Sequence, residues 1–397
     1  MRLLIAPTAY KGTLSPVEAT EVIAEAVCPH TQLHSHSASE ERLENNNPCD
    51  LCPIADGGTG WLEVWAFHFP QAQRVAALVQ DALGRPRTAE WLLLPNGVAV
   101  LESAQAIGIH WLPATELEPM AASSYGVGQM LQQAATHPDT RELWLGLGGV
   151  ATTDGGAGAL QALGFRLLDA QGNSIPQGGA GLRNLHRVEL PDAPPLHGKP
   201  LVLCADVQNT LLDAARVYAP QKGASPQQVK QLIQGLEQLA AVVQRETGID
   251  LHTNTGSGAA GGLAGGLHAY LGAPIVSGIA WLLKQIHGDT RLSNADCLIT
   301  GEGQVDAQTL MGKGVGILIQ HAVALGKPVI VLAGRKGEGW ETVARLPRVQ
   351  VFACAEVAPH LPPTDALRET ATTAFKQVHY NTDADHPAEP YLPDGLP

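Results

Sequence analysis

The sequence predicts an α/β protein in which parallel strands alternate with helices. Short, continuous apolar runs recur along the chain, and segments with helical patterns separate them. The apolar fraction is 45% but aromatic residues make up only 5%, which favours close packing of helices on a parallel sheet over a β-sandwich. With 397 residues, the chain is expected to form two or three domains.

The expected strands and helices follow one another in the order of a sheet with right-handed crossovers. Ser15 and Ser225 each precede a proline, and serine followed by proline is typical of a helix start. The helix after Ser225 is expected to reach about Arg245. The apolar runs predicted to be buried parallel strands cover residues 3–6, 50–55, 142–147, 200–205, 296–300, 328–333 and 349–355.

Two stretches break this alternation and indicate a second domain. Asn96-Gly97 lies between β-rich runs, which predicts a hairpin, and residues 165–190 have the pattern of short strands around glycine turns. We expect a mixed α+β domain to be inserted into a doubly wound one. The predicted boundaries are 1–72 with 288–380 for the doubly wound domain, 73–287 for the second mixed α/β domain, and 381–397 for a flexible tail.

Charge and hydropathy exclude several classes of protein. The net charge is −13 and no run of lysine or arginine is present, so a nucleic-acid partner is not expected. The opening residues lack a long enough apolar stretch for a signal peptide, and no run approaches the roughly 18 apolar residues of a membrane span. We therefore expect a cytoplasmic enzyme without a membrane partner; the sequence leaves a homodimer open.

The cysteines do not indicate a disulfide scaffold, because six in so long a chain are too sparse. Cys204, Cys297 and Cys354 lie within apolar runs and are expected to be buried. Cys49 and Cys52 form a CxxC without a second pair, so a zinc site is not expected there.

One device recurs along the chain: an apolar run, then glycines, then a carboxylate or a lysine. Examples are Asp56-Gly57-Gly58, the stretch 147–156, Asp206 and Gly301-Glu302-Gly303. Glycine-rich strand ends expose backbone N–H groups that favour anions, and nearby carboxylates suit a hard cation that accompanies phosphate, such as Mg²⁺. The pairing predicts phosphoryl transfer.

Known nucleotide motifs do not account for this device. Residues 256–261 match GxGxxG, but no apolar strand precedes them, so a dinucleotide fingerprint is not expected. No Walker A lysine is present, so ATP would have to bind in another way. Lys11 follows the first strand, Lys222 precedes a capped helix, and residues 300–313 combine acids, Gln, Thr and Lys at a strand-to-helix turn.

Together these segments resemble the bacterial glycerate kinase family of the glycerate 2-kinase type, from Met1 to about Phe375. The resemblance implies a flavodoxin-like domain, a second mixed domain and a site in the cleft between them, with ATP, Mg²⁺ and D-glycerate as ligands. The matching motifs are Ala6-Pro7 with Lys11-Gly12, residues 55–58, residues 146–158, Asp206 with Asn209, residues 221–224, residues 258–262, and residues 299–313.

The site residues follow from these motifs and from the needs of phosphoryl transfer. Asp206 and Asp306 are the carboxylates expected nearest the chemistry, one as a Mg²⁺ ligand and the other as a base or as the group that orients the hydroxyl; the sequence does not say which. Glu302 is a further candidate Mg²⁺ ligand. Lys11 is a further candidate catalytic residue, expected to neutralise phosphate or to bind the substrate carboxylate. The other candidate substrate or phosphate contacts are Lys222, Lys313, Asn209, Gln308, Thr309, Asp56, Gly148, Gly149, Asp154, Gly155, Gly156 and Gly258. For Asp154, a role as a turn or helix-cap acid is an equal alternative.

Several motif positions depart from the family pattern. Where the family usually has Asp, Glu, Ser and Asn, this chain has Thr8, Thr59, Val150 and Thr153. Each lost hydrogen bond to a charged group costs on the order of 1.5–3 kcal/mol, so two or three such losses would weaken binding of the usual substrate. A kinase for a related hydroxy acid and a catalytically silent binding protein therefore stay as alternatives.

Overall fold

The computed structural model describes residues 1–29, 48–205, 209–310 and 314–384. Its internal contacts divide the described chain into two compact units. Unit 1 comprises 1–29, 48–53 and 290–384, and unit 2 comprises the described residues of 54–289. Each unit has its own sheet, so the chain has the two-domain α/β architecture that the sequence predicts.

The sheet of unit 1 is parallel, with the strand order β13-β12-β11-β1-β2. Counted within the unit, this order is 2-1-3-4-5, the flavodoxin-like order, which confirms the predicted fold class. Leu3 of β1 pairs with Cys297 of β11 on one side and with Cys49 of β2 on the other. The strands are β1 (Leu3–Ile5), β2 (Cys49–Leu51), β11 (Cys297–Val305), β12 (Val329–Lys336) and β13 (Val349–Ala353).

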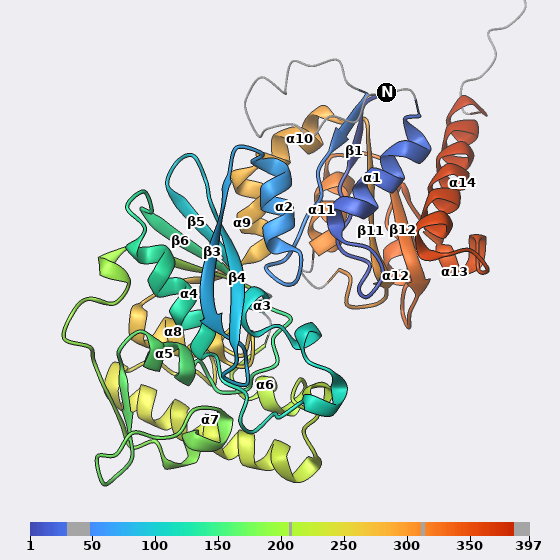
Figure 1. Ribbon diagram of the computed structural model, residues 1–397. Coiled ribbons are helices and arrows are strands. Elements are labelled where there is room, and N and C mark those ends of the chain that lie inside the picture. The colour runs from blue at the N-terminus through green and yellow to red at the C-terminus, as the bar shows by residue number, and fades with distance from the viewer. Residues whose placement is uncertain (30–47, 206–208, 311–313, 385–397) are drawn as a thin grey trace, which may run out of the picture. The chain divides into compact units, whose positions relative to one another are not determined.

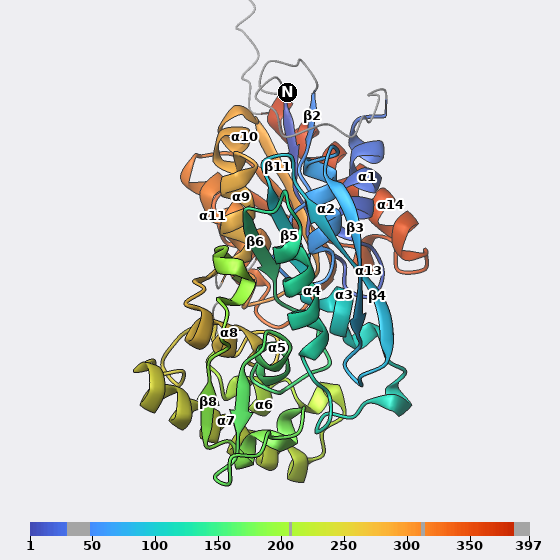
Figure 2. The same cartoon turned by 60° about the vertical axis from the view of Figure 1, so that its left-hand side comes forward.

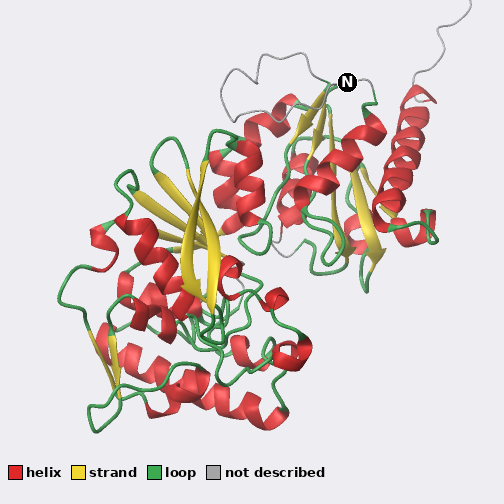
Figure 3. Cartoon of the chain, in the orientation of Figure 1, coloured by secondary structure: helices red, strands yellow, loops and turns green. Residues whose placement is uncertain are grey.

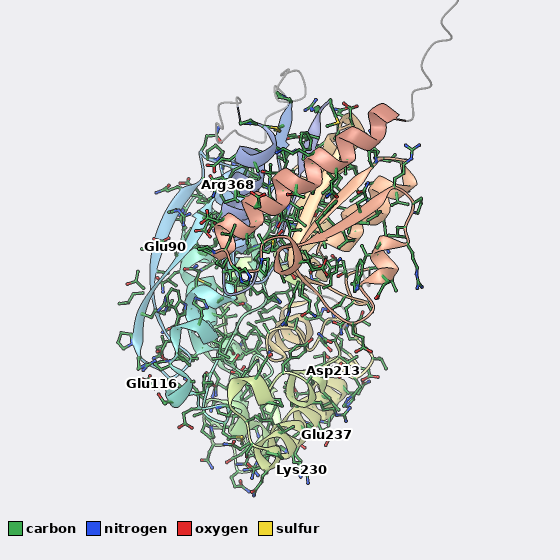
Figure 4. All side chains as sticks on the ribbon, turned by 90° about the vertical axis from the view of Figure 1, so that its right-hand side faces the viewer. Glu90, Glu116, Asp213, Lys230, Glu237 and Arg368 are labelled. Carbon is green, nitrogen blue, oxygen red and sulfur yellow. A yellow bond between two sulfur atoms is a disulfide. The ribbon has the colours of Figure 1, made fainter. Side chains whose placement is uncertain are left out.

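The helices of unit 1 pack around this sheet, with α1 beside the C-terminal helix α14 (Figure 1). Ser15 and Glu18 form a capping box at the start of α1, as serine before proline predicts. Figure 4 marks Arg368 on α14, which forms an ion pair with Glu25 of α1. The helices are α1 (Pro16–Val27), α10 (Gly288–Asn294, which begins in unit 2), α11 (Gly314–Ala324), α12 (Glu341–Ala344), α13 (Cys354–Val357) and α14 (Pro363–Ala384).

The sheet of unit 2 is mixed, with the strand order β10-β9-β6-β5-β4-β3. Strands β10, β9, β6 and β5 run parallel, and β4 and β3 complete the sheet in the antiparallel sense (Figure 3). The predicted turn at Asn96-Gly97 joins β4 to β5, with Gly97 at a φ of 86°. The strands are β3 (Gln73–Gln80), β4 (Pro86–Leu93), β5 (Val98–Glu102), β6 (Glu142–Gly146), β9 (Leu201–Ala205) and β10 (Ile275–Ser277), with β7 (Arg166–Leu168) and β8 (Arg187–Glu189) in a separate ribbon.

Helices cover both faces of this sheet, because alternate residues of each strand point to opposite sides. Leu143 and Leu145 belong to the large core that includes α4. Between them, Trp144 points to the other face, where its ring centroid lies 5.0 Å from that of Trp65 of α2 and 5.4 Å from that of Trp281 of α9. Figure 2 shows that α4 and α5 lie next to each other in unit 2. The helices are α2 (Trp61–His68), α3 (Ser103–Ile107), α4 (Tyr125–Thr136), α5 (Ala157–Ala162), α6 (Asp213–Arg216), α7 (Pro226–Thr247), α8 (Leu263–Leu271) and α9 (Gly278–Gln285).

The long helix α7 shows how sequence and packing agree. Ser225 and Gln228 form its capping box, and Gly248 ends it in the left-handed conformation. Leu232, Leu236 and Leu239 are buried at helical spacing, while the labelled Lys230 and Glu237 in Figure 4 belong to its exposed face.

Two details differ from the sequence-based expectation. Residues 54–72 belong to unit 2, because the tryptophans of α2 pack on β4, β5 and β6 of that sheet. Cys28 and Cys49 are joined by a disulfide that the sequence did not predict. The predicted burial of Cys204, Cys297 and Cys354 is confirmed. Among the described residues, no helix is long and apolar enough to cross a membrane.

Candidate functional site

In unit 1 the candidate residues gather at the carboxyl ends of β1 and β11, the point where the strand order reverses. Ligands of open α/β sheets bind at this kind of switch point. The loop after β1 continues to pair with β11: the Ala6 N–H donates to Ile299 O (2.8 Å) and the Thr8 N–H to Gly301 O (2.9 Å). Lys11 is exposed at this edge, and a Cβ at Gly303 would lie 3.3 Å from the backbone nitrogen of Lys11.

Tyr10 fills the sheet end beneath these residues. Its hydroxyl donates to Leu332 O of β12 at 2.7 Å, and the residue is 4% exposed. A Cβ at Gly301 would lie 2.3 Å from the Tyr10 hydroxyl, so glycine is required there. Burial raises the pKa of Tyr10 well above its usual value, so the phenol stays neutral. Tyr10 therefore has a packing role: it is buried beneath the candidate residues at this end of the sheet.

The acidic segment 302–309 spans the end of β11 and the turn that follows it, and hydrogen bonds join its residues. Thr309 links its two acids: the Thr309 hydroxyl donates to Glu302 Oε1 (2.8 Å) and accepts from the Asp306 N–H (3.1 Å). The Asp306 carboxylate accepts from the Gln308 N–H (2.8 Å) and from Gln304 Nε2 (2.7 Å). The structure thus brings together four predicted residues, and the carboxylate of Asp306 holds the shape of the turn.

In unit 2 the predicted acid Asp154 is fully buried and organises its own loop. Its carboxylate accepts from the Ser124 N–H and hydroxyl (both 2.8 Å), and from the N–H groups of Gly156 and Gly158 (both 3.2 Å). Burial raises the pKa of Asp154, and these hydrogen bonds oppose the rise. Within the described residues, this arrangement supports the alternative of a turn and cap acid that joins α4 to α5.

Lys222 is the buried cation of unit 2. It is 5% exposed, and its Nζ donates to Thr152 O at 2.5 Å. Burial lowers the pKa of Lys222 to about 8, and the charge of Asp154 acts in the opposite direction. The side-chain hydroxyls of Thr152, whose carbonyl accepts this bond, and of the adjacent Thr153 are buried and have no hydrogen-bond partner among the described residues. Burying a hydroxyl without a hydrogen bond costs free energy, so this region is polar and some of its hydrogen-bonding groups lack partners among the described residues.

The predicted glycines allow protein loops to pack against each other. A Cβ at Gly148 would lie 2.7 Å from Gly58 Cα, and one at Gly258 would lie 2.1 Å from Thr210 O. A Cβ at Gly155 would meet Leu239 at 2.3 Å, and one at Gly149 would meet the Thr59 hydroxyl at 2.4 Å. The Asp56 loop, the 148–156 stretch and the 256–262 stretch therefore form one compact cluster in unit 2.

The remaining predicted residues are placed as follows. Asn209 donates from Nδ2 to the Tyr218 hydroxyl (2.8 Å), and its carbonyl accepts from the N–H of Gly256 (2.9 Å) and of Gly258 (3.2 Å). Asp56 Oδ1 accepts from the Gly58 N–H at 3.1 Å. Asp206 and Lys313 lie outside the described residues. Among those described, no group of three or more His, Cys, Asp or Glu side chains could hold a metal ion.

Sequence reasoning missed Glu102 and Ser103 at the carboxyl end of β5. Glu102 is 2% exposed and Ser103 is fully buried, and both bind the loops described above. The signal in the sequence is a glutamate that directly follows the apolar run 98–101, as Asp206 directly follows the run 200–205. A charged residue at the end of a buried strand is rarely there for packing alone.

Comparison with known proteins settles the family. The model of the glycerate kinase family matches residues 3–382. This chain belongs to the glycerate kinase family. It is 35% identical to a glycerate kinase of Halalkalibacterium halodurans, over 86% of this chain and 87% of that protein. It is 34% identical to a glycerate 2-kinase of Escherichia coli, over 84% of this chain and 85% of that protein.

A solved structure supports the same assignment. The crystal structure of a protein assigned as glycerate kinase 2 in Salmonella typhimurium LT2 aligns with a TM-score of 0.73 and 28% identity. The alignment covers 97% of this chain and 99% of that one. Members of the glycerate kinase family are enzymes, so the resemblance that the sequence motifs predict is confirmed, and with it the enzymatic class.

Proposed function

We propose that this member of the glycerate kinase family transfers the γ-phosphoryl group of ATP, with Mg²⁺, to the 2-hydroxyl of D-glycerate. The hydroxyl oxygen would form a bond to phosphorus, the bond to ADP would break, and the hydroxyl proton would pass to a carboxylate. The family match along residues 3–382 carries the proposal. The name glycerate 2-kinase of the Escherichia coli relative favours the 2-hydroxyl.

The site residues support this chemistry through positive charge and shaped turns. Lys11, exposed at the switch point of unit 1, would neutralise phosphate charge. Among the described residues, the Lys222 ammonium donates to Thr152 O, and an ammonium group has three donors. With a pKa of about 8 it is largely charged at neutral pH and would bind a phosphate or the carboxylate of the acid. That both lysines and both aspartates act on the same ligands stays a prediction.

The carboxylates of the 302–309 turn fit a phosphate-bound Mg²⁺ better than a protein-enclosed one. Magnesium is usually bound by one or two carboxylates together with substrate phosphates. Glu302 and Asp306 share Thr309 as a hydrogen-bond partner, and the described residues contain no three-ligand cluster. We propose that one of Asp206 and Asp306 would hold the cation, with Glu302 as a further candidate ligand, and that the cation would offset the negative charge of the phosphates. The other aspartate would orient the hydroxyl or accept its proton.

A second candidate is a kinase for a related short hydroxy acid. Val150 is 3% exposed and apolar, and the buried hydroxyl of Thr153 has no partner among the described residues, at positions where the family usually carries Ser and Asn. These changes alter the polarity of the 148–156 stretch and would favour an acid with a different pattern of hydroxyls. A catalytically silent binding protein is the third reading.

One assay separates the three readings. ADP release is measured with MgATP and D-glycerate, and in parallel with other 2-hydroxy and 2,3-dihydroxy acids. The proposal predicts Mg²⁺-dependent ADP release with D-glycerate and a higher kcat/KM for it than for the other acids. A clear preference for another acid would favour the second candidate. Stabilisation by ATP or an acid without turnover would favour the third.

A further inference from the structure

The carboxyl end of β5 lies where two of the candidate loops meet. The first is the stretch 56–60, which leads into α2, and the second is the stretch 147–149, which follows β6. A Cβ at Gly148 would lie only 2.7 Å from Gly58 Cα, so the two loops touch. Consecutive residues at the end of β5, Glu102 and Ser103, each bind one of these loops.

Glu102 closes the N-terminus of α2 from another strand. The N-cap residue of α2 is Gly60, which provides no side-chain cap. Glu102 Oε2 accepts from the Leu62 N–H at 3.0 Å, and the N–H groups of Gly60 and Trp61 act to lower the pKa of this carboxyl group. A helix N-terminus has orphan N–H groups and a positive partial charge, both of which an ionised carboxylate satisfies. Glu102 thereby fixes the end of the Asp56–Gly60 loop.

Ser103 contacts the backbone of the neighbouring loop through its side-chain hydroxyl. Its hydroxyl lies 3.3 Å from the Gly148 nitrogen and 3.3 Å from the Gly148 carbonyl oxygen. The other side of the first loop is also fixed, because a Cβ at Gly57 would lie 2.3 Å from Cys204 O of β9. Any movement of the stretch 56–60 would therefore disturb its contact with Gly148.

We propose that Glu102 is a positioning residue, whose carboxylate holds the Asp56–Gly60 loop against the Gly148 loop in the form that binds substrate. This inference rests on the proposed function, in which both loops contact the ligands. A purely structural cap would stabilise α2 without any effect on the pH dependence of catalysis. The two readings differ in what happens when Glu102 loses its charge.

The charge of Glu102 responds to pH near neutrality. Burial raises the pKa of Glu102 to about 7, against the lowering effect of the backbone N–H groups at the start of α2, and the charge of Glu63 in the first turn of α2 adds to the rise. Protonation places an O–H where the backbone presents N–H groups, so the hold on α2 weakens below that pH. The ligand-binding form of the loops should be lost in the same range.

The test compares Glu102→Gln with Glu142→Gln as a matched control. Glu142 lies on the adjacent parallel strand β6 but at its opposite end, where it accepts from Trp144 Nε1. We expect the wild-type kcat/KM for D-glycerate to fall about tenfold per pH unit below pH 7, as for one ionisation. Glu102→Gln should remain at least tenfold below the wild type at pH 8 and lack that break, whereas Glu142→Gln should retain it.

Hydrogen exchange in the ligand-free protein gives a readout that does not need turnover. Glu102→Gln should speed deuterium uptake at the amides of residues 60–62 at least tenfold, and Glu142→Gln should not. Ser103→Ala, the second variant, should raise KM for the acid with little change in uptake at 60–62. A wild-type pH profile in Glu102→Gln, or unchanged uptake in it, overturns the inference. If the wild type turns over none of the acids, the proposed function fails, and the uptake comparison alone decides the role of Glu102.

Discussion

At the scale of single residues, Lys222 is a buried cation whose cost to stability depends on pH. Burial lowers its pKa from 10.5 to about 8. Below pH 8 the lysine is charged in both folded and unfolded chains, so the full cost is present. Between pH 8 and 10.5 the folded chain releases the proton first, so stability rises with pH by roughly 3 kcal/mol from this group.

The variant Lys222→Met removes this titration. We expect the free energy of unfolding of the wild type, relative to Lys222→Met, to increase across pH 8 to 10.5 by on the order of 3 kcal/mol. Chemical denaturation at several pH values measures the difference. Lys230→Met on the exposed face of α7 is the control and should show no such trend. A pH-independent difference for Lys222→Met would contradict the account.

Thr153 carries a hydroxyl that is buried without a partner among the described residues. Thr153→Val replaces that hydroxyl with a methyl group of the same shape and should stabilise the ligand-free protein by about 1 kcal/mol. Thr20→Val is the contrasting variant, because the Thr20 hydroxyl donates to Pro16 O at 2.7 Å, and its loss should destabilise by about 1 kcal/mol. Equal effects of the two substitutions in urea denaturation would refute this reading. A raised KM in Thr153→Val would show that the ligand uses the hydroxyl.

At the scale of elements, the capping boxes decide where the long helices begin. Ser225 accepts from the Gln228 N–H, while Gln228 binds back to the Ser225 N–H. Ser225→Ala should lower the free energy of unfolding by about 1 kcal/mol, because an orphan N–H loses its partner. Gln227→Ala, exposed in the same turn, should change it by much less. Denaturant unfolding of both variants makes the comparison, and similar losses would argue against the cap.

The elements that could be predicted are those specified by neighbouring residues. Both serine-proline helix starts, the Asn96-Gly97 hairpin and the buried parallel runs are confirmed, since capping, turn geometry and periodicity act over a few positions. Features that depend on distant contacts escaped prediction. Glu102 caps a helix 40 residues earlier in the chain, and Tyr10 binds a carbonyl 322 residues away. No local pattern encodes either partner.

At the scale of the whole molecule, the order of the motifs predicted the family, and the resemblance implied the flavodoxin-like domain whose strand order the structure shows. The assembly of the site could be predicted less well. Lys222 was expected at an anion, and only the fold shows it buried against Thr152 O. The turn of Glu302, Asp306 and Thr309 was expected to gather polar groups, and the structure shows how one threonine joins them.

The most direct test of the central claim is the identity of the product. The protein is incubated with MgATP and D-glycerate, and enolase is then added with or without phosphoglycerate mutase. We expect a product that enolase consumes without the mutase, which identifies 2-phosphoglycerate, together with an equal amount of ADP. A product that enolase consumes only when the mutase is present, or no phosphorylated acid at all, would contradict the account.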